Sequence, residues 1–158
     1  TSGSSGLLLL NGTTNNGLIT LDGSSPNATV ESNLTFDGTS LYVINNLIVG
    51  LTQSLYTSIG MNIGIGTTNI YSVATASYTS AFYDYYIKNG SNLRAGTITA
   101  VWSGNNIEFT EVSTTDIGNT TTGINAFTFS VVLSSPNAVL RGVSSISGWE
   151  FRSMVRSI

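Results

Sequence analysis

Apolar and polar residues alternate strictly in several short segments of the second half of this chain. In residues 127–133 every odd position is apolar, while Thr128 and Ser130 are polar. Similar alternation occurs in residues 83–87, 98–102, 107–109 and 149–155. Successive side chains of a β-strand point to opposite faces, so this pattern predicts strands with one buried and one solvated face. No stretch sustains the period of an α-helix, and we therefore expect an all-β fold.

Turn-forming residues separate these segments. The turns are expected at Asn89-Gly90, Ser103-Gly104-Asn105-Asn106, Ser134-Ser135-Pro136-Asn137 and Ser147-Gly148. Six or more short strands of this kind form a β-sandwich or a jelly roll. We predict a jelly-roll-like β-sandwich head over residues 67–158. Its last alternating segment continues to Ile158, so we expect this end of the sequence to belong to the sheet.

Residues 7–66 contain shorter segments that cannot form a core alone. The stretch 19–25 returns in similar form as 34–40, and each copy is a brief apolar alternation stopped by Asp-Gly, a strong turn signal. An isolated hairpin is marginally stable in water, and repeated units need stacked neighbours to bury their apolar sides. Three copies of the chain around one axis would supply them. We therefore predict an intertwined trimeric β-stalk over residues 7–66.

Two glycine-containing segments flank this stalk. Residues 1–6 form two Gly-x-y triplets, which fit either the end of a collagen-like stalk or a linker. Residues 59–68, at the end of the expected stalk, are dense in glycine and aliphatic residues, and we interpret them as a bend or neck. Within them Gly64-x-Gly66 lacks the following helix that a dinucleotide fingerprint needs, so no phosphate-binding loop is predicted.

The low charge of the chain favours self-association. Charged residues make up 8% of the sequence, against about 25% in typical globular proteins. Such a surface must stay soluble through neutral polar groups or be covered in an oligomer, and we favour the oligomer. Cys and His are absent, which removes thiol chemistry and the commonest general base. We expect no enzyme activity, no cofactor and no bound metal.

Two partner classes are also not expected. Five basic residues and a formal net charge of −3 make binding to the phosphates of nucleic acid unfavourable. The longest apolar run, residues 7–10, is far below the roughly 20 residues that span a bilayer. Membrane insertion is therefore not predicted.

Few polar residues are placed for site chemistry. Glu108 and Glu111 are close in sequence, but positions i and i+3 of a strand face opposite ways, so they do not form an acid/base pair. Asp116 near Asn119 offers oxygen ligands for calcium, although a solvated loop is the favoured interpretation. Arg141, Arg152 and Arg156 lie in the last two expected strands. Arg152 and Arg156 share a face, where they would receive an acidic sugar, pair with a neighbouring subunit, or only aid solubility.

Tyr78, Tyr83, Tyr85 and Tyr86 form the most interesting group of side chains. Aromatic rings with a polar tip stack on sugars and anchor interfaces. Together with Phe82 these residues occupy both faces of one expected strand, so some would be exposed in a lone chain. We favour a subunit interface for them, ahead of the core and of glycan contact.

Four stretches resemble viral fibre proteins. Residues 62–68, Asn-Ile-Gly-Ile-Gly-Thr-Thr, are similar to the N-V-G-I-G-T stretch of phage and viral tail fibres. Residues 33–41 resemble the N-L-T-F-D-G-T-T-L segments of their stalks. The block 83–102 and the ending 149–158 look like the C-terminal head of fibre-like proteins from aquatic phages and large DNA viruses. The resemblance implies a virion-associated homotrimer, with a collagen-like or β-structured stalk, a β-sandwich head and no catalytic residues.

The expected function follows from these points. We expect a structural fibre tip on the virion surface, outside the cell, that attaches as a homotrimer to a glycan or protein of the host-cell surface. The alternative is a cellular adhesin or extracellular filament subunit, which has the same composition but polymerises head to tail.

Overall fold

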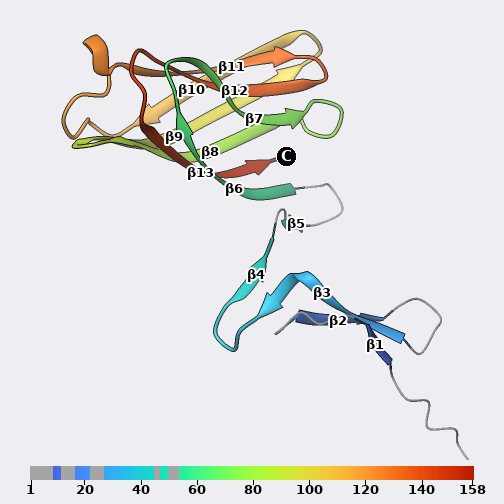
Figure 1. Ribbon diagram of the computed structural model, residues 1–158. Helices are drawn as coiled ribbons and strands as arrows, with labels where there is room; N and C mark the ends of the chain where they lie inside the picture. The colour runs from blue at the N-terminus through green and yellow to red at the C-terminus, as the bar shows by residue number, and fades with distance from the viewer. Residues whose placement is uncertain (1–8, 12–16, 22–26, 45–46, 50–53) are drawn as a thin grey trace, which may run out of the picture. The chain divides into compact units, whose positions relative to one another are not determined.

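The chain is all-β, as the alternation predicts. A computed structural model describes residues 9–11, 17–21, 27–44, 47–49 and 54–158, which contain thirteen strands and one short 3-10 helix. In these residues no helix is long and apolar enough to cross a membrane. The chain divides into two compact units, Thr1–Asn46 and Leu47–Ile158 (Figure 1).

The smaller unit is a single four-stranded sheet. Its strands are β1 (Leu9–Asn11), β2 (Gly17–Leu21), β3 (Asn27–Phe36) and β4 (Leu41–Val43). The long strand β3 pairs with all three others, in parallel with β1 and antiparallel with β2 and β4. The turn between β3 and β4 lies at Asp37-Gly38, as predicted. There the Asp37 carboxylate accepts hydrogen bonds from the backbone N–H groups of Thr39 and Ser40, at 2.9 and 2.7 Å.

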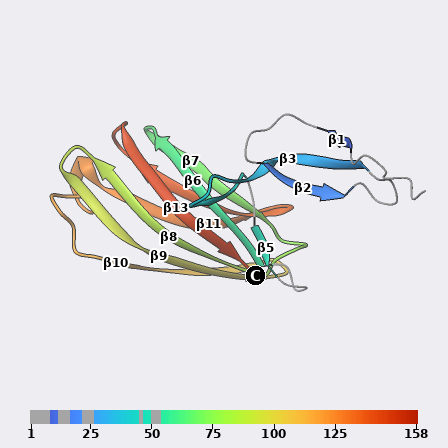
Figure 2. The ribbon, with the colours of Figure 1, turned by 90° about the horizontal axis from the view of Figure 1, so that it is seen from below.

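The larger unit contains a six-stranded antiparallel sheet. Its strands are β5 (Leu47–Val49), β6 (Ser54–Ile63), β8 (Ser80–Asn89), β9 (Asn92–Ser103), β10 (Asn106–Ser113) and β13 (Trp149–Ser157). Their order is β10-β9-β8-β13-β6-β5. The last strand, β13, is therefore an interior strand between β8 and β6 (Figure 2). This position confirms that the C-terminal segment belongs to the sheet.

A three-stranded antiparallel sheet forms the second layer of the larger unit. It consists of β7 (Gly66–Ala74), β11 (Phe127–Ser134) and β12 (Asn137–Ser144), in the order β11-β12-β7. The 3-10 helix Gly123–Asn125 lies in the connection before β11. Side chains from both sheets belong to one buried cluster, so the two layers pack face to face. The two antiparallel layers agree with the predicted all-β fold, while the jelly-roll topology of the head remains a prediction.

Aromatic residues fill the space between the layers. Phe127 and Phe129 of β11 contact Trp149 and Phe151 of β13, with ring centroids 5.4 and 5.9 Å apart, in edge-to-face geometry. Tyr85 of β8 lies 4.6 Å from the Phe129 ring centroid. Such contacts stabilise beyond the burial of their area. These residues occupy the apolar positions of the predicted alternations.

Two-residue loops close three of the hairpins. Asn89 pairs with Asn92, Ser103 with Asn106, and Ser134 with Asn137. Gly90 and Gly104 adopt φ angles of 58° and 59° in the first two loops. These tight hairpin turns require positive φ, which glycine adopts without steric cost. All three turns were predicted from the sequence.

The compact units divide upstream of the boundary expected between stalk and head. Strand β6 belongs to the segment 7–66, yet it pairs with β13 along its whole length, and its Ile63 is buried in the core. The bend expected near residues 59–68 lies at Gly64 and Ile65, where the chain passes from one sheet to the other. Residues 1–6 and the Asp22-Gly23 turn lie outside the described residues. The division of the chain into a functional stalk and a functional head remains a prediction.

Candidate functional site

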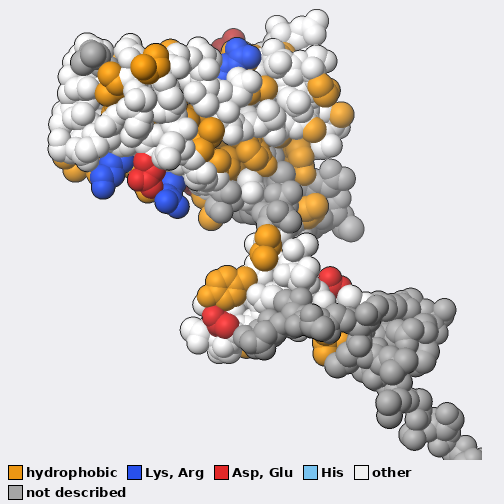
Figure 3. Space-filling view, in the orientation of Figure 1, with side chains coloured by type: hydrophobic (Ala, Val, Ile, Leu, Met, Phe, Trp, Pro, Cys, Tyr) orange, Lys and Arg blue, Asp and Glu red, His pale blue; other side chains and the backbone are white. Residues whose placement is uncertain are grey.

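The outer face of the six-stranded sheet is the best candidate for a binding site. Even-numbered residues of β8 and β13 point away from the core, because their odd-numbered neighbours are buried. We call this surface the charged face and define it by Phe82, Asp84, Tyr86, Lys88, Glu150, Arg152, Met154 and Arg156. It holds three of the chain's five cations. Figure 3 shows basic and acidic side chains side by side on one surface of the larger unit.

Glu150 is the centre of a hydrogen-bonded group on this face. Its Oε1 atom accepts a hydrogen bond from the Tyr86 hydroxyl at 2.9 Å and another from Arg152 Nε at 2.8 Å. Lys88 is the register partner of Glu150 on β8. The Glu150 carboxylate therefore orients the Tyr86 ring and the Arg152 guanidinium, and Lys88 lies at the paired position on the neighbouring strand.

Electrostatics favour the charged form of this group. Hydrogen bonds from Arg152 and then Tyr86 hold the pKa of the Glu150 carboxyl below its ordinary value. The hydrogen bond to Glu150 likewise raises the pKa of Arg152. Both side chains are thus charged at neutral pH, and their mutual orientation is fixed before any ligand arrives.

Two further contacts hold the rest of the face in place. Thr97 Oγ1 on β9 donates a hydrogen bond to Asp84 Oδ1 at 2.8 Å. The Arg156 guanidinium lies over the Phe82 ring, 4.3 Å from its centroid, a cation–π contact. The ionic and aromatic side chains of β8 and β13 are thereby preorganised.

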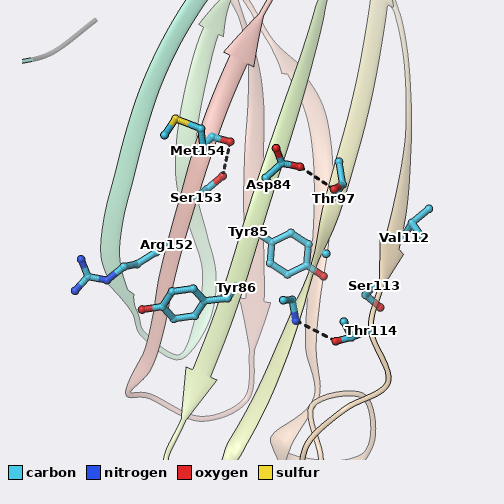
Figure 4. Close-up of a pocket in the computed structure, with 12 residues that line it drawn as sticks. Asp84, Tyr85, Tyr86, Thr97, Val112, Ser113, Thr114, Arg152, Ser153 and Met154 are labelled. Carbon is cyan, nitrogen blue, oxygen red and sulfur yellow. Dashed lines mark hydrogen bonds between the residues drawn. The ribbon is translucent and has the colours of Figure 1, made fainter. Parts of the chain in front are cut away.

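A shallow hollow of about 740 Å³ opens on this face, between β13, β8, β9 and β10 (Figure 4). It is lined by Asp84, Tyr85, Tyr86, Ala95, Gly96, Thr97, Val112, Ser113, Thr114, Arg152, Ser153 and Met154. Ala95 is a small lining residue on β9, and at Gly96 the β10 backbone approaches so closely that a Cβ atom would lie 2.4 Å from the Val112 carbonyl oxygen. Tyr86 and Arg152 also line the hollow. Asp84 is the only carboxylate among the lining residues of this hollow.

Two smaller hollows continue the same surface. One, of about 220 Å³, is lined by Gly60, Met61, Asn62, Glu150 and Arg152. The other, of about 390 Å³, is lined by Tyr86, Lys88, Leu93, Ala95 and Glu150. Each pair of these three hollows has at least one lining residue in common. An extended ligand can therefore follow the surface across several strands.

The four tyrosines singled out in the sequence lie in different environments. Tyr83 and Tyr85 are buried in the core, which is one of the three placements considered for them, and not in the subunit interface that was favoured. Their odd positions on β8 face the second sheet. Tyr78 is half-buried against the core, and its backbone carbonyl accepts a hydrogen bond from Trp102 Nε1 at 2.7 Å. Among the four, Tyr86 alone belongs to the charged face.

The other candidates are separated from one another. Glu108 is exposed and Glu111 points inward toward Arg94, so they face opposite ways as predicted. Asp116 accepts hydrogen bonds from Thr120 and Thr121, and no group of acidic residues in the described ranges could hold a metal ion. Arg141 lies on β12 in the other sheet, where its Nε donates to Asn69 Oδ1 at 2.9 Å, and so it is not part of the patch formed by the arginines of β13.

A buried polar group lies where β9 pairs with β10, and it was not predicted from the sequence. Arg94 is 5% exposed, and its Nη2 atom donates to the Phe127 carbonyl oxygen at 3.0 Å and lies 3.3 Å from Glu111 Oε1. The Tyr85 hydroxyl donates to the same carboxylate oxygen. Burial and this hydrogen bond raise the pKa of Tyr85. The group links β8, β9, β10 and β11, and we assign it a structural role.

Comparison with solved structures gives a distant likeness to phage tailspikes. The tailspike protein of Acinetobacter phage vB_ApiP_P1 is 18% identical, with a TM-score of 0.42, over 82% of this chain and 26% of that one. A tailspike of Acinetobacter baumannii bacteriophage Fri1, described as a capsular polysaccharide depolymerase, is 9% identical, with a TM-score of 0.43, over 83% and 24%. This chain thus spans about a quarter of those proteins. No protein-family description and no curated protein matches its sequence.

Proposed function

We propose that this chain is a structural fibre tip of a virion, which attaches to the host-cell surface as a homotrimer. The observation that carries the proposal is the exposure of apolar side chains in strands β2 to β5. The exposed large apolar residues there are Leu18, Ile19, Phe36, Leu41, Tyr42, Val43, Ile44, Leu47 and Ile48. Leu41, Tyr42, Val43 and Ile44 follow one another in the chain, and Phe36 is the register partner of Leu41. Clustered exposed apolar side chains of this kind mark an interaction site in soluble proteins.

The sheet of the smaller unit explains why copies of the chain would associate. In the described residues this sheet has no second layer, so its apolar side chains have nothing within their own unit to pack against. Burying one such side chain stabilises by about 1.5–3 kcal/mol. Three chains wound together would bury them against one another as an intertwined stalk, and the larger unit would serve as the head. The resemblance of residues 33–41 to fibre stalks favours the same assembly.

Attachment in this proposal is binding and not catalysis. The charged face presents preorganised polar and aromatic groups in shallow hollows, and the hollow of about 740 Å³ has one lining carboxylate. Three copies of a weak site raise avidity strongly when they engage one surface together. The partner is a glycan or a protein of the host-cell surface.

Sedimentation equilibrium of the full chain tests the assembly. We expect a species of three times the 16.6 kDa chain mass at micromolar concentration. A lone chain at that concentration would overturn the proposal. Electron microscopy on the same sample separates the alternative, since filaments of unlimited length would instead identify an adhesin or extracellular filament subunit.

A further inference from the structure

We propose that the charged face binds a carboxylate-bearing polysaccharide, with Arg152 and Lys88 receiving carboxylates and Tyr86 supporting a sugar ring. This inference deepens the proposed attachment role and rests on it. It assigns the ligand class and the contacting residues to one surface of the larger unit.

Arg152 is held in position for a second carboxylate. Its Nε atom is used by Glu150 at 2.8 Å, yet the side chain remains 63% exposed. Figure 4 shows its guanidinium directed away from the strand, at the border of the hollow. A guanidinium presents further N–H donors in a planar fork that matches the two oxygens of a carboxylate. Because Glu150 already orients this fork, little side-chain freedom is lost when a ligand binds.

The charge balance at this end of the face favours an anion. Lys88 and Arg152 flank one carboxylate, that of Glu150, which already accepts two hydrogen bonds. Cations therefore exceed anions here, although the chain as a whole carries −3. Two of the remaining arginines lie elsewhere: Arg94 is buried, and Arg141 lies on the other sheet, where it donates a hydrogen bond to Asn69. Arg156 belongs to the charged face as well, and its guanidinium lies over the Phe82 ring.

Tyr86 and the hollow beside it suit a sugar. The Tyr86 hydroxyl is tied to Glu150, which fixes the ring, and Figure 4 shows the ring at the border of the hollow. Amphipathic rings of this kind stack on sugar faces while their polar tip hydrogen-bonds. Asp84 and Thr97 supply further polar atoms in the same hollow. Its volume of about 740 Å³ falls within the usual range for ligand sites.

A second copy of the chain fits this surface less well. Two such faces in contact would bring Lys88 and Arg152 of one chain near those of the other, while each Glu150 is already satisfied within its own chain. Like charges in contact oppose association. A polymer with one carboxylate per sugar supplies the opposite charge at each step along the connected hollows.

Binding of the full chain to sodium polygalacturonate, measured by isothermal titration calorimetry, tests the inference. Neutral dextran provides sugar without charge, and polyphosphate provides charge without sugar. We expect binding to polygalacturonate that weakens as salt is raised, because ionic contacts are screened. Arg152→Gln and Lys88→Gln should each raise the Kd about tenfold. Arg141→Gln is the matched control and should leave the Kd unchanged.

Each other outcome overturns the inference. Equal binding to polyphosphate would show attraction to charge alone, and equal loss in Arg141→Gln would show that the face is not the site. Sedimentation of the same variants adds an independent readout: dissociation caused by Arg152→Gln would assign the face to a second copy. A trimer that does not bind polygalacturonate defeats this inference and leaves the assembly standing, whereas a lone chain defeats the assembly itself. Lys88→Gln, at an exposed position, guards against misfolding of the other variant.

Discussion

Gly142 lies in β12 directly against the Phe127 ring. A Cβ atom at this position would lie 2.7 Å from Phe127 Cζ and 3.1 Å from Ile70 Cδ1. Phe127 is held by its own neighbours in the core, so the ring cannot move aside without loss of packing. We predict that Gly142→Ala lowers the free energy of unfolding by about 1–3 kcal/mol, as overpacking does. Urea unfolding measures the change.

Gly64→Ala is the control for this prediction. It lies at the bend between the two sheets, and a Cβ there would meet no atom within 4 Å. Its free energy of unfolding should change by at most about 0.5 kcal/mol. Equal destabilisation by the two variants would mean that loss of glycine itself, and not contact with Phe127, is responsible.

The carboxyl of Glu150 gives a prediction about pH. Arg152 and Tyr86 lower its pKa in the folded chain, so its contribution to stability is present above the ordinary value of 4.5 and is lost as pH falls through the folded value. An NMR titration of the Glu150 side-chain carbonyl should therefore show a midpoint below 4.5. In Arg152→Gln the midpoint should rise toward 4.5, because the largest cause is removed. A midpoint unaffected by this substitution would show that the two side chains do not interact in solution.

The orientation of Arg94 could be predicted from the sequence, but its contact with Glu111 could not. It has the same parity as Ile98, Ala100 and Trp102, so its inward orientation was readable from the alternation. Its partner Glu111 belongs to the next strand and was readable as facing the opposite way from Glu108. That the two meet depends on the register of β9 and β10, which the alternation alone does not specify.

Strand β13 occupies the interior of the larger sheet, with β8 and β6 on its two sides. Phe151 on its inner face is fully buried, and its ring lies 6.4 Å from that of Tyr85 and 5.9 Å from that of Phe129. We predict that Phe151→Ala lowers the free energy of unfolding by about 3–5 kcal/mol, as loss of a buried ring does.

Met154 on the same strand is the matched control. It points to the outer face and is 53% exposed. In guanidinium unfolding experiments Met154→Ala should change the free energy of unfolding by about 0.5 kcal/mol or less. A similar loss in both variants would contradict the assignment of the two faces of β13.

The strands themselves were largely predictable, and their order was not. Alternation and turn residues depend on neighbours in sequence, so β8, β9, β11 and β13 and their hairpin turns could be identified. The pairing of β13 with β6 and β8 joins residues far apart in the chain. For the same reason the candidate site was only partly visible: Tyr86 and Arg152 were recognised separately, but β8 and β13 must pair before they share Glu150.

At the scale of the whole molecule, the expected stalk, residues 7–66, coincides only in part with the smaller compact unit, which ends at Asn46. Leu47 to Ile63 of the expected stalk belongs to the larger unit, because β5 and β6 extend its sheet. The change in residue type that the sequence shows begins near residue 59, downstream of the division of the units after Asn46, so it did not mark this boundary. The part that remains outside the larger unit, up to Asn46, also has exposed apolar side chains, on β2, β3 and β4.

Leu41 and Ile44 in this smaller unit carry the last prediction. Both are more than half exposed, at 58% and 54%, and in a homotrimer they would lie against other chains. A buried unpaired carboxylate is strongly unfavourable, so Leu41→Asp combined with Ile44→Asp should convert the trimer to single chains in sedimentation experiments at micromolar concentration. Ile117→Asp, at a 64% exposed position of the larger unit, should leave the trimer intact. Trimers that persist in the double variant would mean that the apolar side chains of β4 and its flank do not hold the chains together.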